Sequence, residues 1–198
     1  MSTTNEHPAP PTGQPAEHGP GAGTGDLARQ ALAGFPAVVA QEPGAPGPYD
    51  KRVLAAMGRV PRHLLIPQLL VPVGEQRPAR RWRPLSVERE PQEHLAACYG
   101  TDQVVVQLDR QPPGPWAPGT QYEGVPSAQS SGAGLIAAAL TALGPQPGER
   151  LVEVGACTGY LAALAAELTG RRVTGWRSTR AWCGPPCPGS RRSAPTCG

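Results

Sequence analysis

The stretch "LVEVGACTGYLAALAAELTG", residues Leu151–Gly170, decides the expected fold. An apolar run from about Arg150 to Val154 leads into a glycine-bearing turn, and an alanine- and leucine-rich segment follows it as far as Gly170. A strand, a glycine loop and a helix in this order open a parallel, doubly wound α/β sheet. The next residues, "RRVTG", predict the beginning of a second strand that ends near Gly175.

The glycine loop is the candidate cofactor site. Gly155 and Gly159 lack a Cβ atom, so the backbone can turn tightly there and approach a ligand closely. The N-terminus of the following helix adds unpaired N–H groups. The loop lacks the G-x-G-x-x-G spacing of dinucleotide sites, which disfavours a dehydrogenase. A loop of this kind after an acidic strand residue, Glu153, is typical of S-adenosylmethionine sites, although glycines needed only for packing would give the same pattern.

Further elements are expected upstream. Apolar spacing predicts a helix in "PYDKRVLAAMGRV", a weaker helix in "QEHLAACYG", a strand at Asp102–Asp109 and a helix at Ala133–Gly144. A loop rich in proline and glycine separates the last two, over residues 110–124. The short segment "PRHLLIPQLL" is apolar and framed by prolines.

The order and spacing of these segments resemble the protein-L-isoaspartate O-methyltransferase family over about Tyr49–Gly175. "VPRHLLIP", Val60–Pro67, is similar to the family segment V-P-R-H-x-F-[VL]-P. "PGERLVEVGACTGY" is similar to P-G-x-x-V-L-E-[IV]-G-x-G-[ST]-G-Y, and no gap is needed between Ser131, at the family serine, and Tyr160. The resemblance is closest to actinobacterial members with an extended loop before the serine.

The chain departs from the family pattern at several positions. Cys157 replaces the second glycine of the loop, Gln129 replaces the threonine before the serine, and Gly132 and Ala133 stand where the family has x-Pro. These departures concern the turn on the substrate side more than the fold.

The resemblance implies a Rossmann-like S-adenosylmethionine-dependent methyltransferase fold and methyl transfer to the carboxylate of an isoaspartyl residue in a protein or peptide. Ser131 is then the expected catalytic residue, which hydrogen-bonds to the substrate or cofactor; its other interpretation is the N-cap of the next helix. The expected cofactor-binding residues are Glu153, Gly155, Ala156, Cys157, Thr158, Gly159 and Tyr160. Alternatives are a methyltransferase acting on a peptide natural-product precursor, and an inactive remnant or binding module.

The family pattern stops at Trp176. An acidic residue that binds the ribose hydroxyls is expected after the second strand, but residues 176–180 are W-R-S-T-R. The codons TGG AGG TCG ACC CGN, preceded by one G, would instead read Val-Glu-Val-Asp-Pro. A one-nucleotide shift near codon 175 therefore predicts that 176–198 is an out-of-frame, disordered tail. The fold would be incomplete at its C-terminus, with weak or absent cofactor binding.

Three regions follow from this pattern. Residues 1–47 are expected to form a disordered, Pro/Gly-rich tail, in which Gly25–Phe35 is either a short helix or loose. Residues 48–175 are expected to form the N-terminal part of a methyltransferase domain, and residues 176–198 the out-of-frame tail. The exposed edge of the first strand would favour aggregation.

Net charge and cysteine content limit the other possible classes of function. A net charge of +3 gives no strong case for nucleic acid or a membrane surface, and the basic run Arg77–Arg83 is interpreted as a solvated loop. Five cysteines without a signal peptide or a long apolar span favour a cytoplasmic monomer with free thiols. Cys183 and Cys187 lack the second ligand pair of a zinc site, so no metal is expected.

Overall fold

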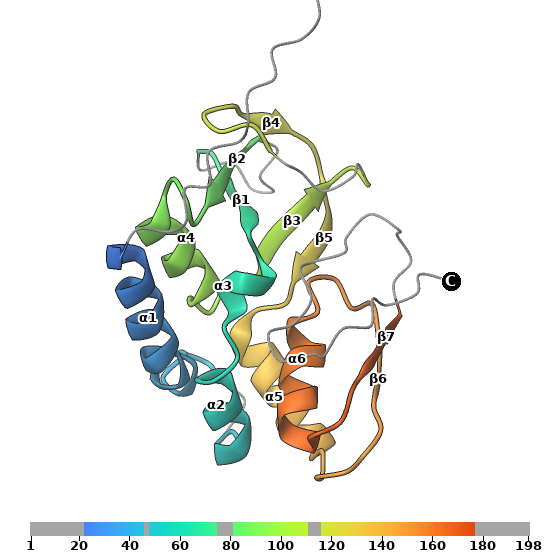
Figure 1. Cartoon of the computed structure of the whole chain (residues 1–198). Helices are drawn as coiled ribbons and strands as arrows, with labels where there is room; N and C mark the ends of the chain where they lie inside the picture. The colour runs from blue at the N-terminus through green and yellow to red at the C-terminus, as the bar shows by residue number, and fades with distance from the viewer. Residues whose placement is uncertain (1–21, 46–47, 75–80, 111–115, 177–198) are drawn as a thin grey trace, which may run out of the picture.

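The computed structural model describes residues 22–45, 48–74, 81–110 and 116–176, which form an α/β structure (Figure 1). Its helices are α1 (Ala22–Ala40), α2 (Lys51–Met57), α3 (Arg62–Leu65), α4 (Pro91–Cys98), α5 (Ala133–Leu143) and α6 (Tyr160–Thr169). Its strands are β1 (Gln68–Pro72), β2 (Arg81–Ser86), β3 (Val104–Leu108), β4 (Tyr122–Glu123), β5 (Pro126–Ser130), β6 (Val152–Val154) and β7 (Thr174–Trp176).

An antiparallel sheet, which the sequence analysis did not predict, occupies the upper part of Figure 1. Its strand order is β4-β2-β1-β3-β5. The predicted strand "VVVQL" is β3, and all five of its residues are buried. Val104 and Val106 face the main core, whereas Val105 belongs to a second cluster with Leu70 and Trp82. The run of valines therefore arises because both faces of this strand are covered.

Helices α2, α5 and α6 lie below the antiparallel sheet, and α1 and α4 lie to one side of it (Figure 1). One apolar core joins them, since Phe35 of α1, Val53 of α2, Ile136 of α5 and Leu164 of α6 belong to the same buried cluster. The glycine loop before α6 is thus attached to the same core as the antiparallel sheet.

Helix α1 corrects the expectation that residues 1–47 form a disordered tail. Residues 22–40 are helical despite their glycines and the internal Pro36. Ala28, Phe35 and Val39 form an apolar stripe that is buried against the rest of the molecule. Tertiary packing of such a stripe outweighs weak helix propensity. Residues 1–21 lie outside the described residues.

The predicted strand, glycine loop, helix and second strand are confirmed as β6, the loop at residues 155–159, α6 and β7. Strands β6 and β7 are parallel, with Val152 opposite Thr174 and Glu153 opposite Gly175. Gly170, with a positive φ of 65°, ends α6 as expected. In the described part of the chain, this parallel sheet has two strands.

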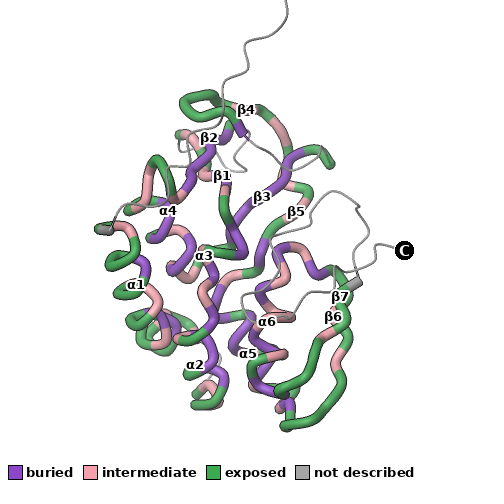
Figure 2. The backbone as a smooth tube through the Cα atoms, viewed as in Figure 1, coloured by how far each residue is buried: buried purple, intermediate pink, exposed green. Residues whose placement is uncertain are grey.

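One face of the β6–β7 pair is open to solvent. Val152 and Val154 are 69% and 76% exposed, and Figure 2 shows β6 as a largely exposed and intermediate segment. Parallel strands in doubly wound folds are normally covered on both faces. In the described residues, the β6–β7 pair is therefore a two-stranded parallel sheet with one face exposed.

Several expectations fall on residues that the structure does not describe. These are the tail from residue 177 onward, with Cys183 and Cys187, and residues 77–80 of the basic run. The rest of that run, residues 81–83, belongs to strand β2 with Trp82 buried, so the expectation of a solvated loop is wrong there. Among the described residues, none of the helices is long and apolar enough to cross a bilayer.

Candidate active site

The glycine loop has the backbone geometry that a close ligand approach requires. Gly155 has a φ of 88° and Gly159 a φ of 76°, values that residues with a side chain rarely adopt. Apart from the adjoining residues of the chain, no atom lies within 4 Å of the place where a Cβ would stand at either glycine. Glycine is therefore needed here for the turn itself, and space remains beside both positions.

The expected cofactor residues differ in how accessible their side chains are. Gly155 is exposed and Cys157 is half-buried. By contrast Ala156, Thr158 and Tyr160 are buried, with Tyr160 only 1% exposed. The side chains of these three residues thus face the protein, so any contact that they make with a cofactor would come from the backbone.

The polar groups of the loop are arranged around the beginning of α6. The N–H of Tyr160 donates to the Thr158 hydroxyl at 3.4 Å, and the N–H of Cys157 donates to the Gly155 carbonyl oxygen at 2.6 Å. The carboxylate of Glu153 belongs to a half-buried residue of β6. Glu153 lies two residues before Gly155, and its contact with a cofactor stays a prediction.

Ser131 lies in the turn between β5 and α5, and its side chain is exposed. The alternative interpretation of Ser131 as a helix cap is wrong, because Gly132 is the N-cap of α5 and no side chain caps that helix. The hydroxyl of Ser131 is consequently available to a ligand on the surface of the turn.

The two departures next to Ser131 have a structural reason. A Cβ on Gly132 would lie 2.6 Å from the carbonyl oxygen of Thr101, so no side chain fits there. The N–H of Ala133 donates to the same oxygen at 3.0 Å, a bond that proline cannot form. The serine turn is therefore fixed to Thr101 by close backbone contact and a hydrogen bond.

Sequence reasoning did not identify the residue that joins the serine turn to the glycine loop. Arg62, the first residue of α3, is fully buried. Its guanidinium donates to the Ser131 carbonyl oxygen at 2.9 Å and to the Ser130 hydroxyl at 3.1 Å. Its Cζ atom lies 5.2 Å from the centre of the Tyr160 ring. The arginine of the V-P-R-H segment was the signal that could have identified it.

Burial sets the protonation of the groups around Arg62. Burial lowers the pKa of the Arg62 guanidinium, which nevertheless remains charged. Burial raises the pKa of Tyr160 and of Tyr99, so both phenols are neutral. Burial also lowers the pKa of His63, whose Nδ1 lies 2.6 Å from the Tyr99 hydroxyl oxygen. His63 thus has a structural partner at Nδ1.

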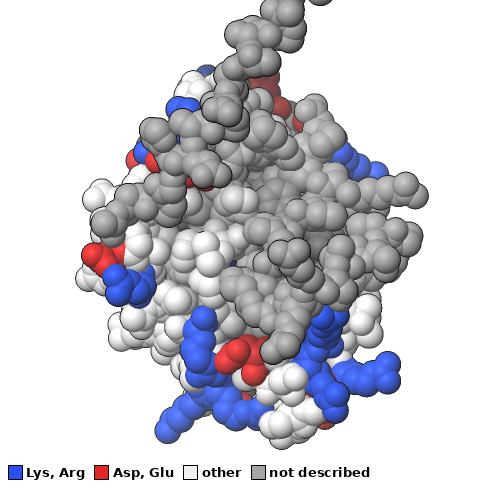
Figure 3. Space-filling model, in the orientation of Figure 1, with Lys and Arg blue, Asp and Glu red and all other residues white. Residues whose placement is uncertain are grey.

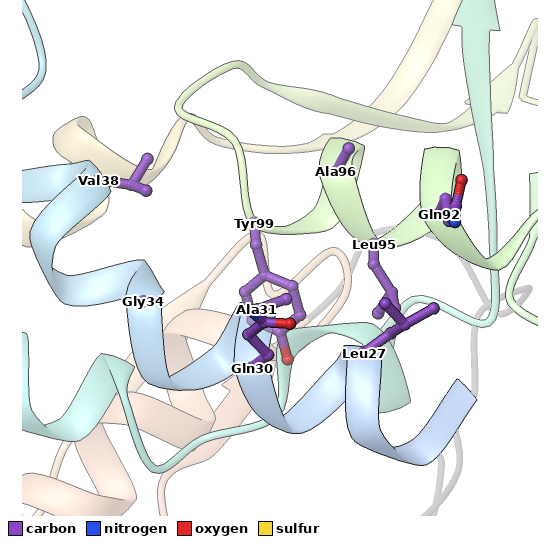
Figure 4. Close-up of a pocket in the computed structure, with 9 residues that line it drawn as sticks. All are labelled: Leu27, Gln30, Ala31, Gly34, Val38, Gln92, Leu95, Ala96 and Tyr99. Carbon is purple, nitrogen blue, oxygen red and sulfur yellow. The ribbon is translucent and has the colours of Figure 1, made fainter. Parts of the chain in front are cut away.

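A shallow groove of about 420 Å³ lies between α1 and α4 (Figure 4). Its lining is mostly apolar, with Leu27, Val38 and Leu95 among its residues. None of the expected site residues lines it, so it is separate from the candidate active site. In the described part of the chain, no group of three or more His, Cys, Asp or Glu side chains is placed to hold a metal ion.

Charges of both signs share the surface near α2 and the ends of α5 and α6. Figure 3 shows acidic atoms among the basic ones on this face. One exposed ion pair there joins Arg59 to Glu167 at 2.6 Å.

Comparisons with known proteins point to methyltransferases. No protein-family model matches the chain. The protein-L-isoaspartate O-methyltransferase of Aeropyrum pernix is 30% identical over 119 residues, which cover 60% of this chain and 30% of the relative. A solved structure of a protein-L-isoaspartate O-methyltransferase aligns with a TM-score of 0.42 and 18% identity over 77% of this chain and 34% of that chain. The chain spans about a third of the length of the relatives that it matches.

Proposed function

We propose that the chain is a protein-L-isoaspartate O-methyltransferase-like protein that uses S-adenosylmethionine to methylate a carboxylate of a protein or peptide. The observation that carries this proposal is the convergence of two motifs on one residue. Arg62 contacts both the Ser131 turn and Tyr160, the first helical residue after the glycine loop. The sequence similarity to the Aeropyrum pernix enzyme supports the same class.

The residues of the glycine loop fit the methionine portion of the cofactor. The open space beside Gly155 and Gly159 admits a ligand close to the backbone, and the N-terminus of α6 favours a carboxylate. S-Adenosylmethionine supplies an activated methyl group when bound. The chain then has to align an ionised substrate carboxylate with that group, and the exposed hydroxyl of Ser131 can donate a hydrogen bond to the carboxylate.

The proposal includes weak cofactor binding. The sequence at 176–180 offers no acid where ribose-binding residues are expected, and the exposed Val152 and Val154 leave one face of the parallel sheet uncovered. We expect a dissociation constant for S-adenosylmethionine weaker than about 100 µM, corresponding to roughly 5 kcal/mol of binding free energy.

Two measurements on the full chain test the proposal. Calorimetric titration gives the cofactor affinity, and transfer of a radiolabelled methyl group to an isoaspartyl peptide gives the activity. The same peptide with a normal aspartyl residue is the control, and a natural-product precursor peptide tests the alternative substrate. Micromolar affinity would contradict weak binding. A stably folded chain that transfers no methyl group at saturating cofactor would favour a remnant or binding module.

A further inference from the structure

We propose that Arg62 is a positioning residue that couples the serine turn to the beginning of α6. This coupling keeps the methyl acceptor, bound at the serine turn, aligned with the methyl donor, bound at the glycine loop. This inference rests on the proposed function. It concerns a side chain that is fully buried and therefore cannot touch either substrate.

Arg62 is held by three segments that lie far apart in the sequence. Its Nη1 donates to the carbonyl oxygen of Cys98, at the end of α4, at 3.0 Å. Its Nη2 donates to Ser130 and Ser131 at the end of β5. Its guanidinium lies over the ring of Tyr160, at the start of α6. The planar guanidinium group of arginine holds several N–H donors in fixed directions and can bind three segments at once, whereas a lysine ammonium cannot hold the same geometry.

The charge of Arg62 is balanced without a carboxylate. The ion pairs found in the described part of the chain do not include it. Its stabilising partners are two carbonyl oxygens, one of them at the negative end of α4, the Ser130 hydroxyl and the face of the Tyr160 ring. Because a buried cation without an acid depends on each of these partners, displacement of one segment weakens the hold on the others.

Tyr160 offers a matched pair of variants. Its hydroxyl oxygen is buried and has no hydrogen-bond partner among the described residues, so the ring is the group that meets Arg62. Tyr160→Phe keeps the ring and removes the hydroxyl, whereas Tyr160→Leu removes the ring. The coupling predicts that only Tyr160→Leu affects the serine turn.

Amide hydrogen exchange followed by mass spectrometry tests the coupling without requiring activity. We expect Arg62→Lys to raise exchange roughly tenfold in residues 128–133 and 156–162, while β1 and β2 change by less than about twofold. Tyr160→Leu should raise exchange in 128–133, and Tyr160→Phe should not. A uniform rise in every segment, or a rise confined to α6 in Tyr160→Leu, would overturn the proposal. If Arg62→Lys does not fold, the comparison of Tyr160→Leu with Tyr160→Phe tests the coupling by itself.

Methyl transfer provides a second readout. If the wild-type chain methylates the isoaspartyl peptide, Arg62→Lys should lower kcat roughly tenfold and change the KM for the cofactor by less than about threefold, as expected when alignment is lost. An unchanged kcat would contradict the positioning role. If the wild-type chain transfers no methyl group, the proposed function fails, whereas the exchange experiment still decides whether Arg62 couples the two segments.

Discussion

The ring of His94 in α4 is joined to the carbonyl oxygen of Ile66 by a hydrogen bond of 2.8 Å from Nε2. His94 is completely buried, and burial lowers its pKa to about 4. The histidine is therefore neutral in the folded protein, with its proton on the nitrogen that donates to Ile66. Protonation of the second nitrogen would place a charge in the core.

This relationship predicts loss of stability in mild acid. Because the folded pKa lies below the unfolded value of about 6.5, stability is complete above that value and falls as the pH decreases toward 4. Between pH 7.5 and pH 5 the free energy of unfolding should fall by about 2 kcal/mol from His94 alone. Urea unfolding at the two pH values measures it. The variant His94→Gln should lose most of this dependence, and an equal loss in both proteins would contradict the assignment.

The positive φ of Gly159 predicts a conformational cost for any side chain there. Gly159→Ala meets no neighbouring atom, so its destabilisation of about 1–2 kcal/mol would come from the left-handed backbone alone. Gly34→Ala in α1 is the matched control, because that glycine is exposed, has free space and lies within a helix. It should stabilise the protein by about 0.5–1 kcal/mol. Thermal unfolding of both variants checks the opposite signs, and equal shifts would refute the explanation.

The sequence predicted those elements in which local pattern and tertiary environment agree. The helix beginning at Tyr160 and the strand at Val104 have apolar patterns bounded by turn residues and largely buried apolar side chains, and both are present. The strand at Val152 is the exception, because it is present although its valines are exposed. Apart from β3, the strands of the antiparallel sheet were not predicted because they carry prolines or charges. Strand β2 contains Pro84 at a buried position, and β5 begins at Pro126, so only pairing with neighbours identifies them as strands.

The candidate site was predictable to a similar extent. Local sequence fixed the glycine loop, since positive φ at Gly155 and Gly159 is a property of the backbone at those residues. The role of Arg62 depends on Ser131 and Tyr160, which are distant in sequence, and charged residues are rarely expected to be fully buried. A local sequence pattern therefore cannot predict long-range contacts of this kind.

The exposed valines of β6 predict self-association. The double variant Val152→Thr, Val154→Thr keeps the β-branched shape but places hydroxyl groups on the open face. It should reduce concentration-dependent light scattering and change the free energy of unfolding by less than about 0.5 kcal/mol, as is usual for surface sites. Val106→Thr, at a 1% exposed position of β3, should instead cost about 1–3 kcal/mol because its hydroxyl is buried. Unchanged scattering in the double variant would show that this face does not drive association.

The interrupted pattern at Trp176 predicts that acidic residues at 176–180 would strengthen cofactor binding. The relevant variant combines Trp176→Val, Arg177→Glu, Ser178→Val, Thr179→Asp and Arg180→Pro. A control carries the same apolar changes with Arg177→Gln and Thr179→Asn, so that the two differ only in carboxylate charge. A carboxylate that accepts hydrogen bonds from both ribose hydroxyls should tighten S-adenosylmethionine binding roughly tenfold or more relative to the control.

Calorimetric titration of the two proteins decides this prediction. Tighter binding by the acidic variant alone means that β7 ends beside the ribose site and that the missing acid limits cofactor affinity. Equal affinities would mean that the end of β7 does not reach the cofactor. Sequencing the coding DNA across codons 170–180 is the independent check, because an additional G there would restore Val-Glu-Val-Asp-Pro in frame. Confirmation of the present reading frame would instead show that a methyltransferase-like glycine loop is made in this chain without the expected ribose-binding acid.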